Sequence, residues 1–184
     1  MSIYNTPADA ANTAVRAYLT KIGEYYRGCN FNTGSGKGQK DWQKIKNEIF
    51  NGECAYCGTP DSNLQMEHLI MFNRTDFGLH HPGNIVPVCK KCNSRSKKEN
   101  GNYNNWEDHL SYICEINNAR ELFHKRWNRI RQHQKEGEFA YPELSKEERE
   151  SIRIIANNLY EKIKAEFENS ITLYKELDKT FTKG

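Results

Sequence analysis

Apolar side chains recur at helical spacing near the start of the chain. They are Ala11, Val15, Tyr18, Ile22 and Tyr25. Positions three and four residues apart share one face of a helix, so this face is suited to a hydrophobic core. Thr6 followed by Pro7 is typical of an N-cap and first helical turn. We therefore predict an amphipathic helix over residues 7–26.

A longer apolar stripe runs toward the other end of the chain. Ser145 and Glu148 have the spacing of a capping box and mark its start. Its members are Ile152, Ile155, Leu159, Ile163, Phe167, Ile171, Tyr174, Leu177 and Phe181. At about 1.5 Å per residue this helix measures roughly 50 Å, which is longer than a small domain is wide. The stripe therefore either packs against residues 7–26 or pairs with a second copy in a homodimer.

Between these helices the pattern changes to short elements. The segment GCNFNTGSGKGQK is expected to be a flexible connector, because it lacks the G-x-x-x-x-G-K-[ST] pattern of a phosphate-binding loop. Asp41 can then cap a short helix. The apolar residues that this helix buries are Trp42, Ile45, Ile49 and Phe50. Two strands should follow, over residues 64–70 and 85–88, joined by a loop that contains glycines and Pro82.

Helices dominate the rest of the chain. We expect one to begin at about Asn93, and Asn105 and Asn118 have the character of N-caps for two more. With only two short strands among these helices, the predicted fold class is α+β and mostly helical.

The composition is polar, with 36% hydrophobic and 28% charged residues. No apolar run approaches the about 20 residues of a membrane span. The first residues, MSIYNTPADAAN, lack the basic start and apolar stretch of a secretion signal. We therefore expect a cytoplasmic protein that does not contact a membrane. The formal charge of +3 is too small to name a polyanionic partner.

The distribution of charge is more informative than its sum. One acid-free stretch contains Lys90, Lys91, Arg95, Lys97 and Lys98. A second contains Lys125, Arg126, Arg129, Arg131 and Lys135. Each can be a solvated helix face or a surface that binds phosphates.

Four of the six cysteines form two C-x-x-C pairs, Cys54 with Cys57 and Cys89 with Cys92. Each pair can place two thiolates on one ion, and together they satisfy the four-coordinate sphere of structural zinc. In a chain without a secretion signal this use is favoured over disulfides. We interpret Cys29 and Cys114 as ordinary buried thiols or free cysteines.

Residues 58–88, between the two cysteine pairs, contain a carboxylate beside an imidazole, Glu67 and His68. On a regular strand these side chains project to opposite faces unless a bulge intervenes. Such a pair alone is more typical of a solvated acid beside a structural histidine. It is followed in order by Asn84, the second cysteine pair and Asn93.

The run EHLIMFNRTDFGLHHPGNIVPVCKKCNSRSKK resembles the signature of HNH endonucleases, which have a ββα-metal core. The resemblance covers Cys54 to Lys98. It implies a zinc-bound nuclease module over residues 51–104, between an N-terminal helical segment, 1–50, and a C-terminal helical region, 105–184. The flanking helices resemble no family that we can name.

The resemblance also implies a role for each motif residue. His68 matches the general base that takes a proton from water, and Asn84 matches the middle residue that fastens the loop and helps to hold the histidine. Glu67 and Asn93 match the ligands of a catalytic divalent ion, Mg²⁺ or Mn²⁺. An ion with oxygen ligands can stabilise the charge that builds up when a phosphodiester in DNA is hydrolysed. The zinc cannot do so, because four thiolates close its coordination sphere.

The basic residues after the motif then gain a function. Lys90, Lys91, Arg95, Lys97 and Lys98 are expected to contact the nucleic-acid backbone. Two departures from the family are visible: Glu67 stands where aspartate is commoner, and Met71 stands where proline often follows the strand. His80 and His81 could join the metal or touch phosphate, but we interpret them as surface loop residues.

Two other classes of protein remain open. A zinc module that binds nucleic acid without catalysis would have the same cysteines and basic residues, but it has no need of Glu67, His68 and Asn93 together. A zinc-stabilised adaptor could use the long C-terminal helix to bind a protein. Small HNH proteins resemble restriction, mobile-element or anti-phage defence nucleases, and the sequence does not choose among these settings.

Overall fold

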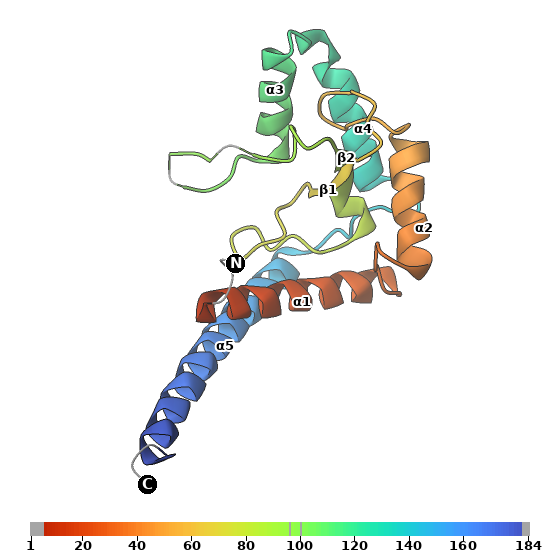
Figure 1. Ribbon diagram of the computed structural model, residues 1–184. Helices are drawn as coiled ribbons and strands as arrows, with labels where there is room; N and C mark the ends of the chain where they lie inside the picture. Colours follow the sequence, from red (N-terminus) through yellow and green to blue (C-terminus); the bar gives the residue numbers. More distant parts are fainter. Residues whose placement is uncertain (1–5, 96, 100, 182–184) are drawn as a thin grey trace.

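The computed structural model describes residues 6–95, 97–99 and 101–181. The flanking segments predicted over 1–50 and 105–184 therefore extend beyond it at residues 1–5 and 182–184. The helices are α1 (Pro7–Arg27), α2 (Gly36–Lys44), α3 (Trp106–Ile116), α4 (Phe123–Lys135) and α5 (Lys146–Phe181). Short π and 3₁₀ turns occur at η1 (Ile45–Ile49), η2 (Pro82–Asn84) and η3 (Arg120–Leu122). Two strands, β1 (Gln65–His68) and β2 (Ile85–Val88), form an antiparallel hairpin. The fold is thus α+β and mostly helical, as predicted (Figure 1).

The buried apolar residues form two clusters. The first surrounds β2, which is buried along its whole length, and joins it to α2, α3, α4 and the cysteines. The second joins α1 to the first half of α5 and includes Leu79 from the loop between the strands. The hairpin is therefore embedded in the first cluster, and its connecting loop rests on the second.

Helix α1 begins and ends at residues suited to those positions. Thr6 caps it, and its side chain exchanges hydrogen bonds with Asp9 in a capping box. Gly28 ends it with a φ of 73°, which favours glycine. Gly23 allows a close approach to the loop between the strands, because a Cβ at this position would lie 2.4 Å from the carbonyl oxygen of His80.

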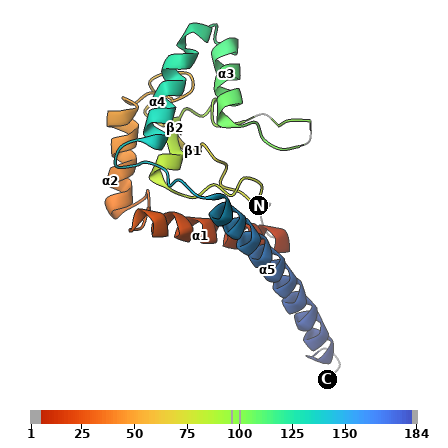
Figure 2. The same cartoon turned by 180° about the vertical axis from the view of Figure 1, so that it is seen from behind.

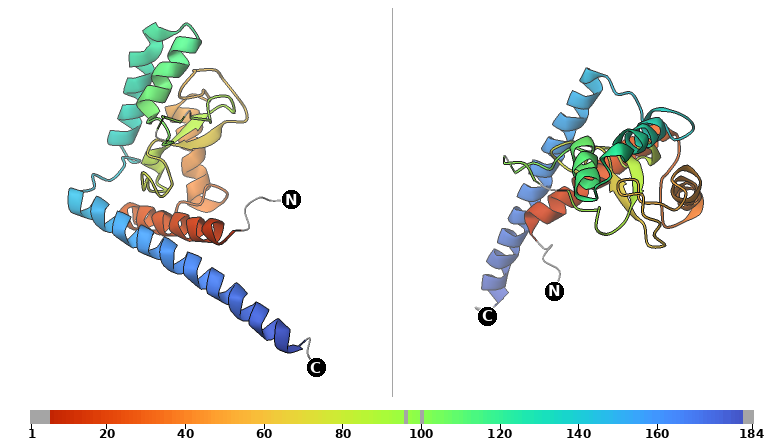
Figure 3. Two further views of the ribbon diagram at one scale, coloured as in Figure 1. Left: turned by 90° about the vertical axis from the view of Figure 1, so that its left-hand side faces the viewer. Right: turned by 90° about the horizontal axis from the view of Figure 1, so that it is seen from above.

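Helix α5 has two environments along its length. Its first half packs against α1 through Ile152, Ala156 and Tyr160, so the predicted packing against residues 7–26 is present within one chain. Its second half extends away from the body (Figures 1 and 2). There the apolar stripe is uncovered, and the exposed fraction rises from 39% at Phe167 to 72% at Phe181. Figure 3 shows α5 from the side, with its second half continuing beyond the end of α1.

Three sequence predictions were wrong in detail, namely the extent of the connector, the cap at Asp41 and the cap at Asn118. Helix α2 begins at Gly36, inside the predicted connector, and Asp41 lies within it and pairs with Arg27. Asn118 has a φ of 52° and does not cap a helix, since α4 begins at Phe123. The expected Asn105 cap is confirmed by a hydrogen bond from the Asp108 amide to its side chain.

The largest difference concerns the helix expected from Asn93. None of the described residues between Asn93 and Asn105 is helical. Instead, Lys97 pairs with Tyr103 in an isolated β-bridge, and the next helix begins at Trp106. Within this segment the Arg95 side chain turns inward and donates to the carbonyls of His68 and Leu69 at the end of β1. None of the helices described here is both long enough and apolar enough to cross a bilayer.

Candidate functional site

The four predicted zinc ligands come together in the structure. One ligand atom from each of Cys54, Cys57, Cys89 and Cys92 lies within 4.8 Å of the others. Four sulfurs at about 2.3 Å from a tetrahedral ion lie about 3.8 Å apart, and the Sγ atoms of Cys57 and Cys89 are separated by 3.8 Å. The donor set and its dimensions therefore fit zinc.

Each cysteine pair lies in a tight turn. The Gly58 amide donates to the carbonyl of Cys54, with Gly58 at a φ of 73°. The amides of Cys92 and Asn93 both donate to the carbonyl of Cys89. The Ala55 amide also donates to Pro87 in β2, so the first turn is held against the hairpin. Losing this centre would therefore disturb the hairpin directly.

Electrostatics within the cluster also favour a cation. Hydrogen bonding from Cys54 lowers the pKa of the Cys57 thiol. The reciprocal interactions raise the pKa of Cys54 to about 11 and raise that of Cys92. Several anionic sulfurs cannot lie together without a neutralising charge, and a divalent ion supplies that charge.

The hairpin places Glu67 and His68 on opposite faces. The register is continuous, with Glu67 opposite Val86 and His68 opposite Ile85. The side chains therefore alternate as on a regular strand, and no bulge brings the carboxylate and the imidazole together. The structure accordingly separates the two residues that are adjacent in the motif.

On the Glu67 face the carboxylate is paired with Arg95. Arg95 Nε lies 2.6 Å from Glu67 Oε1, and the exposed fractions of the two side chains are 2% and 13%. Neither atom has hydrogen-bond geometry despite this distance, so the pair is an ion contact. Burial raises the pKa of Glu67, and the charge of Arg95 opposes that rise.

Arg95 is further fixed by the backbone. Its guanidinium donates to the carbonyl oxygens of His68, at 2.5 Å, and Leu69, at 3.1 Å. The Arg95 side chain is thus buried and its charge is matched by Glu67, so in this structure it does not present a free cation to a nucleic-acid phosphate. Sequence reasoning missed this pairing, because nothing in the spacing of 67 and 95 reveals it.

Asn93 lies on the same face as Glu67. Its Nδ2 donates to Gln65 Oε1 at 2.8 Å, and Gln65 and Glu67 are two positions apart on β1. Oxygen-bearing side chains thus gather here, and their donor type fits a hard cation such as Mg²⁺. The structure brings Asn93 to Gln65, while the Glu67 carboxylate is held by Arg95.

Asn84 is fully buried and fastens the loop between the strands. Its Oδ1 accepts from the amide of Ile70, and its Nδ2 donates to the carbonyls of Ile70 and Leu79 at 2.9 Å. Its own carbonyl accepts from the Leu69 amide. These four bonds close the loop directly after His68.

His68 faces a second imidazole, that of His80. The distance from His68 Nε2 to His80 Nδ1 is 3.1 Å, and the His68 ring stacks on Phe72 at a centroid distance of 4.8 Å. Burial, then the charges of His80 and Arg95, lower the pKa of His68 to about 3. Burial also lowers the pKa of His80. Both rings are therefore neutral at pH 7.

The two loop histidines are not surface residues, contrary to the sequence interpretation. His81 is buried, and its Nδ1 accepts from the Gly83 amide at 3.1 Å. His80 is half-buried and contacts the ring of Phe31, which follows α1. The only available signal was their position in a motif loop, and it does not distinguish a buried histidine from an exposed one.

The remaining basic residues of the first run are exposed. Lys90 and Lys91 lie beside the second cysteine pair. Lys97 lies over the ring of Tyr103, and Lys98 is 3.6 Å from Asp108. All four are accessible to an anionic partner, unlike Arg95.

Comparisons with known proteins agree with the motif. Residues 54–99 match the family model described as HNH endonuclease. A protein of Bacillus subtilis (strain 168), named "SPbeta prophage-derived putative HNH endonuclease YoqL", is 32% identical over 112 residues. The match covers 53% of this chain and 44% of that relative, so the chain spans less than half of the relative's length. No solved structure matches the chain significantly.

Proposed function

From the premise that residues 54–99 carry an HNH endonuclease domain, we propose that this protein is a metal-dependent endonuclease that hydrolyses phosphodiester bonds in DNA. The observation that carries the proposal is the state of His68: a neutral imidazole at the end of β1, fixed at one ring nitrogen by a second histidine. A neutral imidazole can accept a proton from an attacking water.

The contacts of His80 favour one tautomer of His68. His80 hydrogen-bonds the backbone of Phe31, and this bond opposes the lowering of the His80 pKa by burial, as donation to a carbonyl does. Because a neutral imidazole has one N–H, the Nδ1 of His80 then accepts, and Nε2 of His68 donates. The free lone pair of His68 is therefore on Nδ1, and we assign the proton transfer to this atom.

Glu67 and Asn93 are the proposed ligands of the catalytic Mg²⁺ or Mn²⁺. Such an ion stabilises negative charge on the phosphate and on the departing oxygen. The side-chain oxygen atoms of Gln65, Glu67 and Asn93 lie on one hairpin face and are of the type that ligates such an ion, which supports this role. Because Arg95 holds the Glu67 carboxylate, ion binding must compete with that pair. Manganese titration followed by electron paramagnetic resonance should show weaker binding in Asn93→Ala.

The cysteine cluster is proposed to hold one structural zinc. Its four sulfurs have the spacing of a tetrahedral site, and the region around it is tied to β2 through Ala55. Elemental analysis of protein purified without added metal should give one zinc per chain. A value clearly below one would remove this part of the proposal.

A plasmid assay tests the proposed activity. Supercoiled DNA is incubated with the zinc-loaded protein and Mg²⁺ or Mn²⁺, with the same protein without added Mg²⁺ or Mn²⁺ as the control, and the topology is read on a gel. Nicked or linear product should appear only with the divalent ion. If supercoiled DNA survives under all conditions, the catalytic proposal fails.

The second candidate function is a non-catalytic zinc module that binds nucleic acid. The separation of His68 from Glu67 and Asn93 on the two hairpin faces is the observation that favours it. DNA binding without metal-dependent cleavage, in protein with full zinc content, would select this function.

A homodimer remains a proposal for the uncovered half of α5. Phe167, Ile171 and Tyr174 continue the face that α1 covers in the first half. A second copy would bury this stripe. A monomeric mass by light scattering at micromolar concentration would exclude the dimer.

A further inference from the structure

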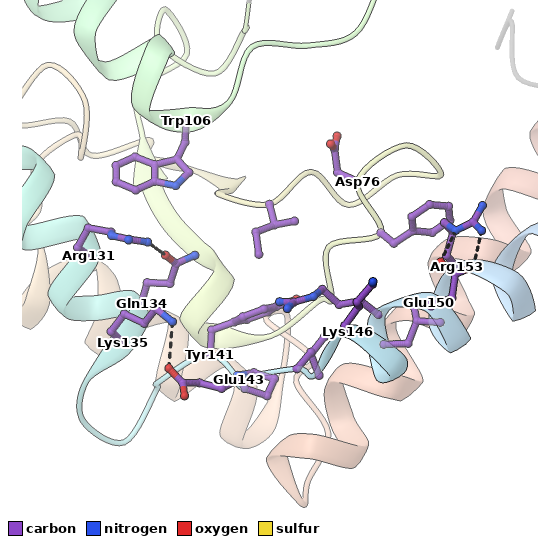
Figure 4. A pocket seen from close by; sticks show the side chains of 16 residues that line it. Asp76, Trp106, Arg131, Gln134, Lys135, Tyr141, Glu143, Lys146, Glu150 and Arg153 are labelled. Carbon is purple, nitrogen blue, oxygen red and sulfur yellow. Dashed lines mark hydrogen bonds and ion pairs between the residues drawn. The ribbon is translucent and has the colours of Figure 1, made fainter.

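Two neighbouring cavities lie beside the hairpin and are not used by the proposed chemistry. The larger measures about 690 Å³ and the smaller about 390 Å³. Ile70, Asp76 and Trp106 line both, so the cavities adjoin along these residues. The larger one is bounded by α4, the segment after it and the first turns of α5, all outside the HNH domain (Figure 4).

The larger cavity has an excess of positive charge. Its cations are Arg131, Lys135, Lys146, Arg149 and Arg153, and its acids are Asp76, Glu143 and Glu150. Two of the cations are matched, because Lys135 lies 3.1 Å from Glu143 and Arg153 lies 2.5 Å from Glu150. Both ion pairs are visible in Figure 4.

Three cations of this cavity have no ion pair within the described part of the chain. Lys146 and Arg149 are exposed at the start of α5. Arg131 lies over the ring of Trp127, and its guanidinium donates to Gln134. These three charges are therefore available to an anion that enters the cavity.

The smaller cavity is lined by neighbours of the proposed catalytic residues. It is lined by Leu69 and Met71, which follow His68 in sequence, and by Arg95, which pairs with Glu67. A polyanionic chain that occupied both cavities would pass the end of β1. Lys98, from the segment after the motif, lines the same cavity.

The walls suit a nucleotide chain better than a small anion. The side chains of Ile70, Phe77 and Tyr141 add apolar surface to the lining that holds the cations. Sugars and bases need apolar contacts, while phosphates need cations at intervals along the chain. A single phosphate ion would leave most of this lining without a partner.

We propose that the two cavities together bind the sugar-phosphate backbone of the DNA strand next to the bond cleaved at His68, with Arg131, Lys146 and Arg149 contacting phosphates. The inference rests on the proposed nuclease function for its substrate. It adds that the C-terminal region, and not only the HNH domain, supplies substrate contacts.

The test measures DNA binding in the absence of cleavage. His68→Ala protein with its zinc in place, in buffer without added Mg²⁺ or Mn²⁺, is titrated against a fluorescein-labelled duplex of 20 base pairs, and anisotropy gives Kd at several salt concentrations. The double variant Lys146→Gln/Arg149→Gln, called the Lys146/Arg149 pair, is compared with the double variant Lys175→Gln/Lys179→Gln, called the control pair. The control pair removes the same charge from the distal part of α5, far from the cavities (Figure 1).

Loss of two phosphate contacts should reduce the slope of log K against log salt by about 1.8 and weaken binding by about tenfold or more near 0.1 M salt. The control pair should keep the wild-type slope. Equal slopes and affinities in both pairs, or no binding of the duplex by the parent protein, would overturn the proposal. Thermal melting of each variant checks that the exposed substitutions leave the fold intact.

The plasmid assay separates this inference from the proposed function. If the Lys146/Arg149 pair weakens binding but the wild-type protein does not cut, the cavities bind DNA and the nuclease proposal fails. If the wild-type protein cuts and the Lys146/Arg149 pair binds and cuts as well as the control pair, the nuclease proposal stands and the cavities are not the substrate path.

Discussion

At His68 one imidazole nitrogen contacts His80, and the ring is stacked on Phe72. We predict that His68→Ala reduces the rate of cleavage by about 10²- to 10⁴-fold, which is the usual contribution of a positioned base. Zinc content and DNA affinity should be nearly unchanged, because the side chain contacts neither. Single-turnover cleavage and anisotropy measure the two effects separately.

His80 provides the control for this prediction. His80→Asn retains an acceptor for the Nε2 proton of His68, whereas His80→Ala does not. Nitrogen NMR of the His68 ring should report one tautomer in the wild-type protein and a mixture in His80→Ala. A His68→Ala protein that cuts plasmid as fast as wild type would reject the assignment of the base.

The buried pair of Glu67 and Arg95 governs stability at the residue scale. Removing one partner of a buried ion pair typically costs about 3–5 kcal/mol, because the other charge is left without a counterion. We predict a loss of this order in Arg95→Ala, measured by urea unfolding. The double variant Glu67→Gln/Arg95→Ala should recover part of the loss, since no buried charge remains. Equal losses in both variants would show that the pairing itself contributes nothing.

At the scale of elements, the contact between α1 and the strand-connecting loop depends on Gly23. Glycine within a helix usually costs about 0.5–1 kcal/mol relative to alanine, so Gly23→Ala would ordinarily stabilise α1. Here the new Cβ would lie 2.4 Å from the His80 carbonyl oxygen and would push the helix from the loop. We therefore predict a lower free energy of unfolding for Gly23→Ala. An increase in that free energy would show that α1 does not approach the loop this closely.

At the scale of the whole molecule, three histidines are buried and two more, His68 and His80, are half-buried. Burial lowers the pKa of His68, His80, His81, His109 and His133, to about 3 for His68 and about 4 for His81. Their ordinary pKa is 6.5, so below this pH the unfolded chain binds protons that the folded protein cannot. The stabilisation they give is complete above about pH 6.5 and is lost as the pH falls toward the lowered values.

We predict that the free energy of unfolding falls between pH 7 and pH 5. Urea titrations at both values measure it, and a chromogenic chelator reports whether zinc is released at the same time. His81→Asn should reduce the pH dependence, while the change of the exposed His124 to Gln should leave it intact. A stability that does not vary over this range would contradict the prediction.

The sequence by itself determined the features that depend on neighbours a few residues apart. The caps and apolar spacing of α1 and α5, the Asn105 cap and the turns of the two cysteine pairs are of this kind. The order of motif residues from Glu67 to Asn93 also indicated the resemblance that the family-model match over residues 54–99 bears out. In each case the interacting groups lie close in the chain, so spacing alone specifies the geometry.

Only the tertiary structure decided which distant side chains meet. Arg95 turns inward to Glu67, and the helix expected from Asn93 is absent from the described residues there. His80 reaches His68 because α1 and Asn84 hold the loop between the strands. The cations of α4 and α5 line a cavity beside the hairpin for the same reason. These contacts join segments many residues apart, and their free energy depends on burial and charge pairing, which local spacing does not encode.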